Sequence, residues 1–359
     1  MSARREFLSK FALPGLLGLA VGEHSGAAEA LLPEGEAGEQ EGLVRLRRRA
    51  MGCDFEIYVR RRDEKALRTA QEALSILEPL EQQMSIFRQD SELNEMNRRA
   101  FAQPVLVEKR LFDLLCLARR LGEETGGAFD ITGRPLTRVW LEAQGERRPP
   151  SAAEIEQVRR KVGVGLVALD AEAGTLRFLA EGVELDLGAI GKGYAVDRVV
   201  ELLEENGVEE ALVHAGFSSV RATGTGPDGK GWAVGIRRPM GAQPGSHSAA
   251  TVYLRRQAMG TSASQRPACE GAVAGPRHLI DPRSGYPVAE ALSATAFAPS
   301  AAQADALSTA FCIMGVVATR EYCRRHAESA ALLLLPGAAA GQLQAVKIGV
   351  TQDEVEVLI

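Results

Sequence analysis

The sequence predicts an α+β fold, in which helices and strands are mixed without strict alternation. Apolar residues alternate with polar ones at Phe55, Ile57 and Val59, which is the period of a half-buried strand. From about Glu108 to Glu124 apolar residues recur every three or four positions, which is the period of an amphipathic helix. Short strand patterns then dominate the middle of the chain. This order favours α+β over a doubly wound parallel sheet.

The remaining elements follow from the same periods and from helix-ending residues. In chain order we expect a strand around Phe55–Val59, a helix carrying Leu67 to Leu77, a helix over 108–124 closed by Gly126 and Gly127, a short helix with a Ser151–Glu154 capping box, strands at 166–169, 175–178 and 183–187, a helix at 193–206 ended by Gly207, strands at 211–213, 232–236 and 251–254, helices at 302–314 and 318–326, and a hairpin around Pro336-Gly337.

Composition excludes several classes of protein. The 359 residues carry a formal net charge of −5, which argues against a general nucleic-acid binder. The basic clusters Arg47-Arg48-Arg49 and Arg237-Arg238 stand among alternating apolar residues and are expected on solvated strand edges. The five cysteines match no zinc spacing, and Cys116 and Cys312 fall on apolar helix faces. We expect no cysteine chemistry.

Residues 1–30 resemble a twin-arginine export signal. Arg4 and Arg5 precede a short apolar run from Phe11 to Gly22, and Ala28-Glu29-Ala30 is a small-x-small cleavage site. The run is too short to span a bilayer. The alternative is a frayed apolar helix.

A leader rich in Glu and Gly follows this signal. Residues 31–42 lack periodicity and are expected to be flexible. We therefore expect an exported protein, periplasmic or otherwise extracytoplasmic, without stable membrane insertion.

The densest motif is Asp186-Leu187-Gly188-Ala189-Ile190-Gly191-Lys192-Gly193-Tyr194. A predicted strand runs into a glycine-rich turn, and a helix opens at the lysine. Such a turn lets backbone approach a ligand, and a helix N-terminus with a lysine suits phosphate. The spacing matches neither a Walker A loop nor G-x-G-x-x-G. A purely structural strand–turn–helix remains the alternative.

A second motif is His278-Leu279-Ile280-Asp281-Pro282-Arg283-Ser284-Gly285. An imidazole and a carboxylate three residues apart can face one pocket, and histidine is the usual proton acceptor near neutral pH. The alternative is a His–Asp pair that only fixes a turn.

The third motif is Ala304-Asp305-Ala306-Leu307-Ser308-Thr309-Ala310, on an otherwise apolar helix. Asp305 and Thr309 are four residues apart and share one face. Carboxylate and hydroxyl oxygens suit Mg²⁺ shared with phosphate rather than zinc. The alternative is an exposed aspartate and a threonine bonded to its own helix.

Two upstream segments add apolar and small contacts. Met84-Ser85-Ile86-Phe87-Arg88 can place Phe87 against a flat ring, and Thr125-Gly126-Gly127-Ala128-Phe129-Asp130 is a glycine-rich turn with an aromatic residue and a carboxylate. Core packing of the aromatic residues is the alternative.

Together these motifs resemble the ApbE family, the FAD:protein FMN transferases. Seven segments match in order: Met51-Gly52, Met84-Ser85 with Asp90-Ser91-Glu92-Leu93, Thr125 to Asp130, Asp186 to Tyr194, Thr261-Ser262, His278 to Pro282, and Ala304-Asp305-Ala306 with Thr309. The resemblance covers about Arg47 to Gly315. It implies that 43–359 form one FAD-binding domain with a T-fold-like core of mixed sheets and packed helices.

The resemblance also implies the chemistry. The enzyme would move FMN from FAD to a Thr or Ser hydroxyl of an acceptor redox protein, with Mg²⁺, and release AMP. The FAD site would be lined by Met51, Met84, Ser85, Ile86, Ala128, Phe129, Asp130, Asp186, Lys192 and Ile280. Mg²⁺ would be held by the Ala189 carbonyl, Asp305 and Thr309, with Ser308 close by, and the catalytic residues would be His278 as base, Asp305 and Lys192.

The chain departs from the family pattern in two places. Many members have Gly-Gly-Asp after the strand at 211–213, where this chain reads His214-Ala215-Gly216-Phe217-Ser218-Ser219 without an aspartate. Thr261-Ser262-Ala263 lacks the usual glycine after the serine. Two alternative functions stay open. One is an FAD pyrophosphatase that forms FMN and AMP, with water in place of the acceptor. The other is a non-catalytic exported FAD-binding protein, which the missing aspartate favours.

Overall fold

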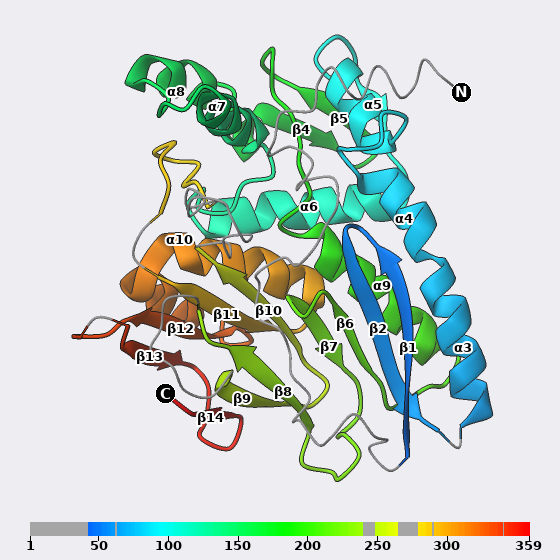
Figure 1. Cartoon of the computed structure of the whole chain (residues 1–359). Coiled ribbons are helices and arrows are strands. Elements are labelled where there is room, and N and C mark those ends of the chain that lie inside the picture. The colour runs from blue at the N-terminus through cyan, green and yellow to red at the C-terminus, as the bar shows by residue number, and fades with distance from the viewer. Residues whose placement is uncertain (1–41, 62, 240–247, 265–278, 289–290, 340) are drawn as a thin grey trace, which may run out of the picture.

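The alternating segment around Phe55 forms the strand β2 (Cys53–Arg60), whose Phe55, Ile57 and Val59 side chains are fully buried on one face. The computed structural model describes residues 42–61, 63–239, 248–264, 279–288, 291–339 and 341–359. Within them, eight strands form one sheet in the order β1-β2-β6-β7-β10-β11-β12-β13 (Figure 1). Every neighbouring pair in it is antiparallel.

The bounds of the elements are as follows. They are β1 (Leu43–Ala50), β2 (Cys53–Arg60), α3 (Glu64–Ser75), α4 (Leu77–Met84), α5 (Glu92–Arg99), β3 (Val105–Leu106), α6 (Lys109–Glu124), α7 (Arg134–Gly145), α8 (Ala152–Arg159), a 3-10 turn (Val164–Leu166), β4 (Val167–Asp170), β5 (Thr175–Phe178), α9 (Gly191–Glu205), β6 (Leu212–Ala215), β7 (Ser219–Ala222), β8 (Trp232–Arg237), β9 (Ser248–Leu254), β10 (Ala258–Ala263), β11 (Ser293–Ala298), α10 (Ala301–Arg325), β12 (Ala330–Pro336), β13 (Leu343–Ile348) and β14 (Val355–Val357).

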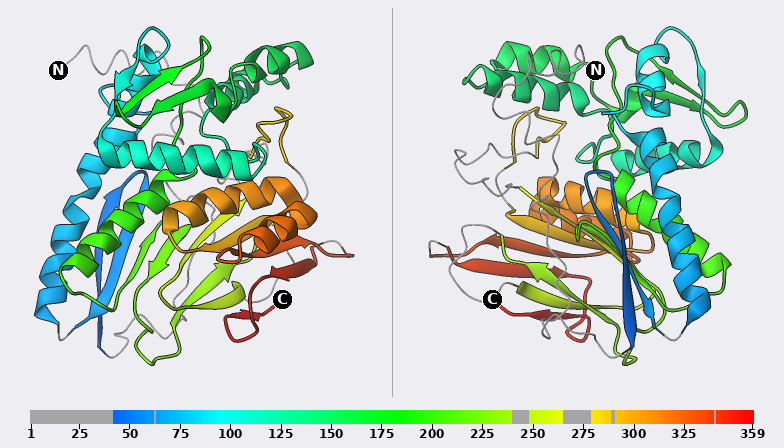
Figure 2. Two further views of the ribbon diagram at one scale, coloured as in Figure 1. Left: turned by 180° about the vertical axis from the view of Figure 1, so that it is seen from behind. Right: turned by 45° about the vertical axis from the view of Figure 1, so that its right-hand side comes forward.

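The large sheet is covered on both faces. Helices α3, α9 and α10 pack on one face, and the small sheet β14-β9-β8 covers part of the other (Figures 1 and 2). A third sheet, β3-β5-β4, lies with α5 and α7 at the far side of α6. The α+β prediction is confirmed.

Two hydrophobic cores follow from this layering. The larger one joins the helices to the sheet and includes Phe55, Leu115 and Phe311. The smaller one lies between the two sheets and includes Trp232 and Phe297. Strand residues alternate between the two cores because successive side chains point to opposite faces.

Most expected elements are present, with shifts of a few residues. The strand 175–178 is β5, the capping box of Ser151 and Glu154 starts α8, and β12 and β13 form the expected terminal hairpin. The expected strand edge at Arg47–Arg49 is the outer strand β1 of the large sheet. Cys53, Cys116, Cys312 and Cys323 are free thiols.

The two helices expected near the C-terminus are confirmed: together they make up α10, which is divided by a kink at Gly315. This glycine has φ 70° and ψ −174°, a left-handed conformation that breaks the helical path. α10 is apolar and long enough to span a membrane by length and composition, yet 67% of its most apolar window is buried within the protein. It serves as a core helix.

Candidate active site

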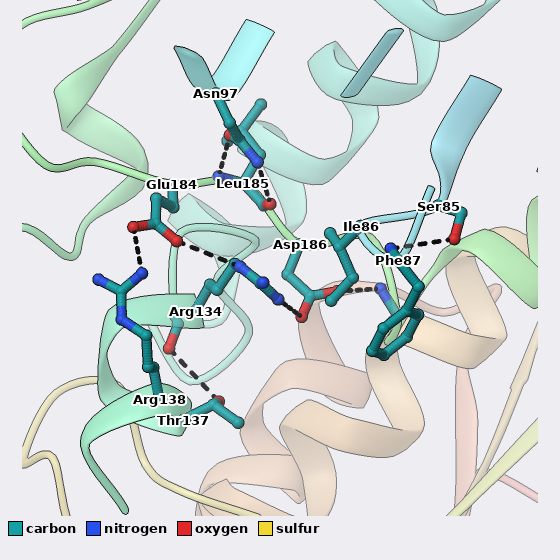
Figure 3. A network of polar contacts seen from close by, with 12 residues as sticks. Ser85, Ile86, Phe87, Asn97, Arg134, Thr137, Arg138, Glu184, Leu185 and Asp186 are labelled. Atoms are coloured by element: carbon teal, nitrogen blue, oxygen red, sulfur yellow. Dashed lines mark hydrogen bonds and ion pairs between the residues drawn. The ribbon is translucent and has the colours of Figure 1, made fainter. Parts of the chain in front are cut away.

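The motif Asp186–Tyr194 lies where an extended segment enters α9. The expected strand at 183–187 is wrong, because these residues join no sheet. Instead, Asn97 on α5 takes the place of a neighbouring strand: its Nδ2 donates to the Leu185 carbonyl at 3.0 Å and its Oδ1 accepts from the Leu185 N–H at 2.7 Å (Figure 3). The backbone is thereby satisfied without a ladder. Sequence reasoning missed Asn97, which stands 88 residues away.

Asp186 is part of a partly exposed ion-pair network with α7. Arg134 Nε lies 3.1 Å from one Glu184 oxygen and its Nη1 lies 3.9 Å from Asp186, while Arg138 donates to the other Glu184 oxygen at 2.6 Å (Figure 3). Asp186 also accepts from the Gly188 N–H at 2.8 Å, which shapes the turn before α9. We call Arg134, Arg138, Glu184 and Asp186 the surface network.

Asp305 is buried on the first turns of α10, so the exposed alternative is wrong. Its Oδ2 accepts from the Gly193 N–H at 3.0 Å, which joins it directly to the start of α9. Burial raises the pKa of Asp305, and the nearby Lys192 ammonium and the Gly193 N–H oppose that rise. Burying a charge costs free energy unless the charge is compensated. A buried carboxylate beside a lysine therefore favours a functional role for Asp305 over a purely structural one.

Hydroxyl groups gather one turn further along α10. Ser262 Oγ, on β10, lies 2.8 Å from Ser308 Oγ and 3.0 Å from Thr309 Oγ1. Ser308 also donates to the Asp305 carbonyl at 2.8 Å. Asp305, Ser308 and Thr309 therefore share one region, as their helical spacing predicts. Ser262 entered the sequence argument only through the family resemblance.

Two glycines let α10 come this close to its neighbours. A Cβ on Gly193 would lie 2.1 Å from the Ala301 carbonyl oxygen, and a Cβ on Gly260 would lie 2.4 Å from the Ala304 carbonyl oxygen. Both positions need space rather than an unusual φ. The close approach brings Asp305 to α9 and Thr309 to Ser262.

The hairpin turn Met51-Gly52 contacts the end of α4. The Met51 N–H donates to Glu81 of α4 at 3.1 Å, and Met51 has φ 49°. Cys53 is close enough to Lys192 and Asp305 to interact with their charges, but burial raises the pKa of its thiol to about 11. The thiol is therefore protonated near neutral pH.

Met84, Ser85 and Ile86 lie at the end of α4. Met84 is buried, Ser85 caps the helix, and Ile86 is partly buried beside Asp186 (Figure 3). Phe87 is 80% exposed and lies on the same side of Asp186 (Figure 3). An exposed aromatic ring beside a glycine-rich turn is free to stack on a flat ligand.

Ala128, Phe129 and Asp130 lie deeper. Ala128 and Phe129 are core residues. Both Asp130 oxygens are engaged, one by the N–H and hydroxyl of Thr132 and the other by the Val164 N–H, and burial raises its pKa. Ala128 is fully buried and Phe129 is 2% exposed, so neither presents an open surface to a ligand in this structure.

The segment 279–288 is anchored to α7. Trp140 Nε1 donates to the Gly285 carbonyl at 2.8 Å, and Ile280 pairs with Pro287 in a short bridge. Asp281 binds Arg283 through both carboxylate oxygens. His278 lies outside the described residues, so its role stays a prediction.

The stretch that replaces Gly-Gly-Asp turns between β6 and β7. Phe217 has φ 58° and stacks on His214, with ring centroids 4.3 Å apart. Ser219 is fully buried, and its hydroxyl is one of the groups that oppose the rise in the pKa of Asp305. A hydroxyl thus borders the carboxylate from β7.

The oxygen groups around α10 fit a hard cation. Asp305 supplies one carboxylate, Ser308 and Thr309 supply hydroxyls, and Ala189 lies on the turn before α9 with a carbonyl. Among the described residues no three His, Cys, Asp or Glu side chains gather as a zinc site needs. A single carboxylate suits Mg²⁺, which keeps waters and takes substrate phosphate oxygens as further ligands.

Comparison with known proteins agrees with this architecture. A model of the ApbE family matches residues 51–333. The chain is 30% identical over 286 residues to the FAD:protein FMN transferase of Haemophilus influenzae, covering 76% of this chain and 81% of the relative. The solved flavin transferase ApbE from Vibrio cholerae has a TM-score of 0.73 at 26% identity, covering 85% of this chain and 97% of that one. The ApbE protein of Thermotoga maritima has the same TM-score at 28% identity and the same coverage. The chain belongs to the ApbE family.

Proposed function

We propose that this protein transfers the FMN part of FAD to a Thr or Ser hydroxyl of an acceptor protein and releases AMP, with Mg²⁺. The observation that carries this proposal is the buried Asp305, fixed to the N-terminus of α9 beside Lys192 and followed by the hydroxyls of Ser308 and Thr309. This arrangement combines groups for a hard cation with groups for a pyrophosphate.

The cation would be held by the Ala189 carbonyl, Asp305 and Thr309, with Ser308 close by. When bound, Mg²⁺ neutralises pyrophosphate charge and polarises the phosphorus that is attacked. Lys192 and the N–H groups at the start of α9 would bind the phosphate oxygens and stabilise the charge that grows on them. The start of α9 and the part of α10 that carries Asp305 already contact each other, because the Gly193 N–H donates to Asp305.

The rest of FAD would contact the residues described above. Asp186, with its carboxylate oriented by Gly188 and Arg134, would bind a polar part of the ligand. The remaining contacts proposed for FAD are Met51, Met84, Ser85, Ile86, Ala128, Phe129, Asp130 and Ile280, and we add Phe87 because of its exposure.

The proposed reaction is one displacement at phosphorus. The acceptor oxygen forms a bond to the FMN phosphorus while the bond from that phosphorus to the AMP phosphate oxygen breaks. His278 is the proposed base that takes the hydroxyl proton. AMP leaves with the electron pair of the broken bond.

The test is a direct search for the flavinylated product. The purified protein is incubated with FAD, Mg²⁺ and extracytoplasmic redox proteins from the same cells, and flavin-carrying proteins are identified by fluorescence and mass spectrometry. We expect an FMN adduct with wild type and none with Asp305→Ala. AMP release that no acceptor accelerates would instead indicate an FAD pyrophosphatase. Tight FAD binding without AMP would indicate a binding protein.

We also propose export through the twin-arginine-type signal in residues 1–30, so that the acceptor is a redox protein of the same extracytoplasmic compartment. Replacing Arg4 and Arg5 by lysines should retain the protein inside the cell. Continued export of that variant, measured by fractionation, would contradict this assignment.

A further inference from the structure

Asp197 is a buried carboxylate that none of the roles above uses. It lies on α9, one turn after Gly193, and is 5% exposed. Its Oδ1 accepts from the Ala301 N–H at 2.8 Å and its Oδ2 from the Ala302 N–H at 2.8 Å. These are the first two residues of α10, whose N–H groups have no partner within their own helix.

Arg221 on β7 completes the arrangement. Its Nη1 lies 2.7 Å from Asp197 Oδ1, so one carboxylate receives three hydrogen bonds from two other elements. Burial raises the pKa of Asp197, while Arg221 and the two N–H groups oppose that rise. A buried charge of this kind is strongly destabilising unless it is compensated, which argues for a specific role.

The bonds between α9 and α10 run in both directions. Asp197 of α9 accepts from the start of α10, and Asp305 of α10 accepts from Gly193 at the start of α9. On each helix the two participating positions are four residues apart, so each pair lies on one face. We call Gly193, Asp197, Ala301 and Asp305 the clasp.

An ordinary helix cap would not achieve this. Ser300 already caps α10 locally, because its side chain accepts from the Gln303 N–H at 3.2 Å. That bond fixes where the helix begins but not where it lies relative to α9. The bonds of Asp197 fix the position of α10 along and around α9.

We propose that Asp197, oriented by Arg221, is a positioning residue that aligns Asp305 and Thr309 with the Ala189 turn and Lys192 to form the cation site. The inference rests on the proposed function, because it takes that site to bind Mg²⁺ and pyrophosphate. Asp197 touches neither ligand in this role. It acts through the relative position of two helices.

The test measures Mg²⁺ binding rather than turnover alone. Wild type and Asp197→Asn are titrated with Mg²⁺ by calorimetry in the presence of ADP, which offers a pyrophosphate without a flavin, and ADP is titrated separately without metal. We expect the Mg²⁺ dissociation constant of Asp197→Asn to rise at least tenfold, with metal-free ADP affinity unchanged within twofold. FMN transfer should need correspondingly more Mg²⁺ for half-maximal rate.

The matched control is Ser300→Ala, which weakens the same helix end without touching the clasp. It should lower the melting temperature and leave the Mg²⁺ dissociation constant within twofold of wild type. If Asp197→Asn binds Mg²⁺ like wild type, or if both variants shift it equally, Asp197 is only a stabilising cap and the proposal is wrong.

A second variant covers the case in which Asp197→Asn does not fold. Arg221→Gln keeps both backbone bonds of Asp197 and removes its charged partner, and we expect a two- to fivefold rise in the Mg²⁺ dissociation constant. An unchanged value in that variant overturns the proposal. A wild type that binds Mg²⁺ with ADP but transfers no FMN would refute the proposed function and leave this inference standing, whereas a wild type without Mg²⁺ binding would refute both.

Discussion

The α10 side of the site and the α7 side are held together by different interactions. On the α10 side, buried carboxylates accept backbone N–H groups and a glycine leaves no room for a side chain. On the α7 side, the surface network consists of partly exposed ion pairs beside the exposed ring of Phe87. Buried bonds resist displacement and exposed pairs adjust easily. The proposed cation-binding groups thus lie on the rigid side, whereas Asp186 and Phe87, two of the proposed FAD contacts, lie on the adjustable side.

We expect the largest loss of stability and activity from a substitution at Gly193, where α9 and α10 are packed too closely to admit a side chain. In Gly193→Ala the new Cβ would meet the Ala301 carbonyl oxygen at 2.1 Å, so α9 and α10 must separate. We expect a loss of about 3 kcal/mol in the free energy of unfolding and loss of Mg²⁺-dependent transfer. Urea denaturation and a transfer assay measure both. Gly145→Ala, which meets nothing within 4 Å, is the control and should be neutral in both; an equal loss there would remove the packing argument.

Asp305→Asn separates function from stability on the same side. We expect transfer to fall about 100-fold, since the proposed metal would supply several kcal/mol of charge stabilisation. Burial raises the pKa of Asp305, so the folded state holds its proton more tightly than the unfolded chain does. Metal-free wild type therefore loses stability as pH rises from the ordinary value of 3.8 through the folded pKa.

Asp305→Asn has no carboxylate to ionise at this position, so it does not lose stability in this way as pH rises. Metal-free Asp305→Asn should have a higher urea midpoint than wild type at pH 7 and a smaller difference from it at pH 3. A variant less stable than wild type at pH 7 without metal would show that the carboxylate stabilises the fold, contrary to the direction of its pKa.

Phe87→Ala tests the adjustable side. The ring is 80% exposed, so we expect less than about 0.5 kcal/mol change in unfolding free energy. Loss of stacking on FAD should weaken FAD affinity about fivefold, corresponding to about 1 kcal/mol. Fluorescence titration of FAD measures this. Val317→Ala, at 84% exposure beyond Gly315 on α10, is the control and should bind FAD like wild type.

Arg138→Gln should give the smallest effect. Arg138 is partly exposed and pairs with Glu184 and, across one helical turn, with Glu142. Exposed pairs contribute about 0.5 kcal/mol, and salt screens them. The difference in urea midpoint between Arg138→Gln and wild type should be small, and it should vanish at a salt concentration of about 0.5 M. A large loss of FAD affinity would show that the surface network is as rigid as the α10 side.

Local patterns in the sequence were sufficient where a segment is stabilised by its own neighbours. The capping box of α8 and the alternation of β2 are of this kind, and so is the spacing of Asp305 and Thr309 on one helix face. The prediction of a strand at 183–187 was wrong because this segment pairs with the Asn97 side chain rather than with another strand. Asp197 could not be recognised, since nothing nearby in sequence shows that it caps a helix 104 residues later.

The clasp also has a consequence for the order in which the protein folds. Its bonds join segments separated by 104 to 112 residues, with β6 to β11 lying between them in the chain. Contacts of such long range form late in folding, because closing the intervening loop costs chain entropy. The proposed cation site is therefore completed only when the central sheet is in place. Ligands that bind this site stabilise the fully folded protein by mass action, but they do not stabilise a partly folded chain in which the site is incomplete.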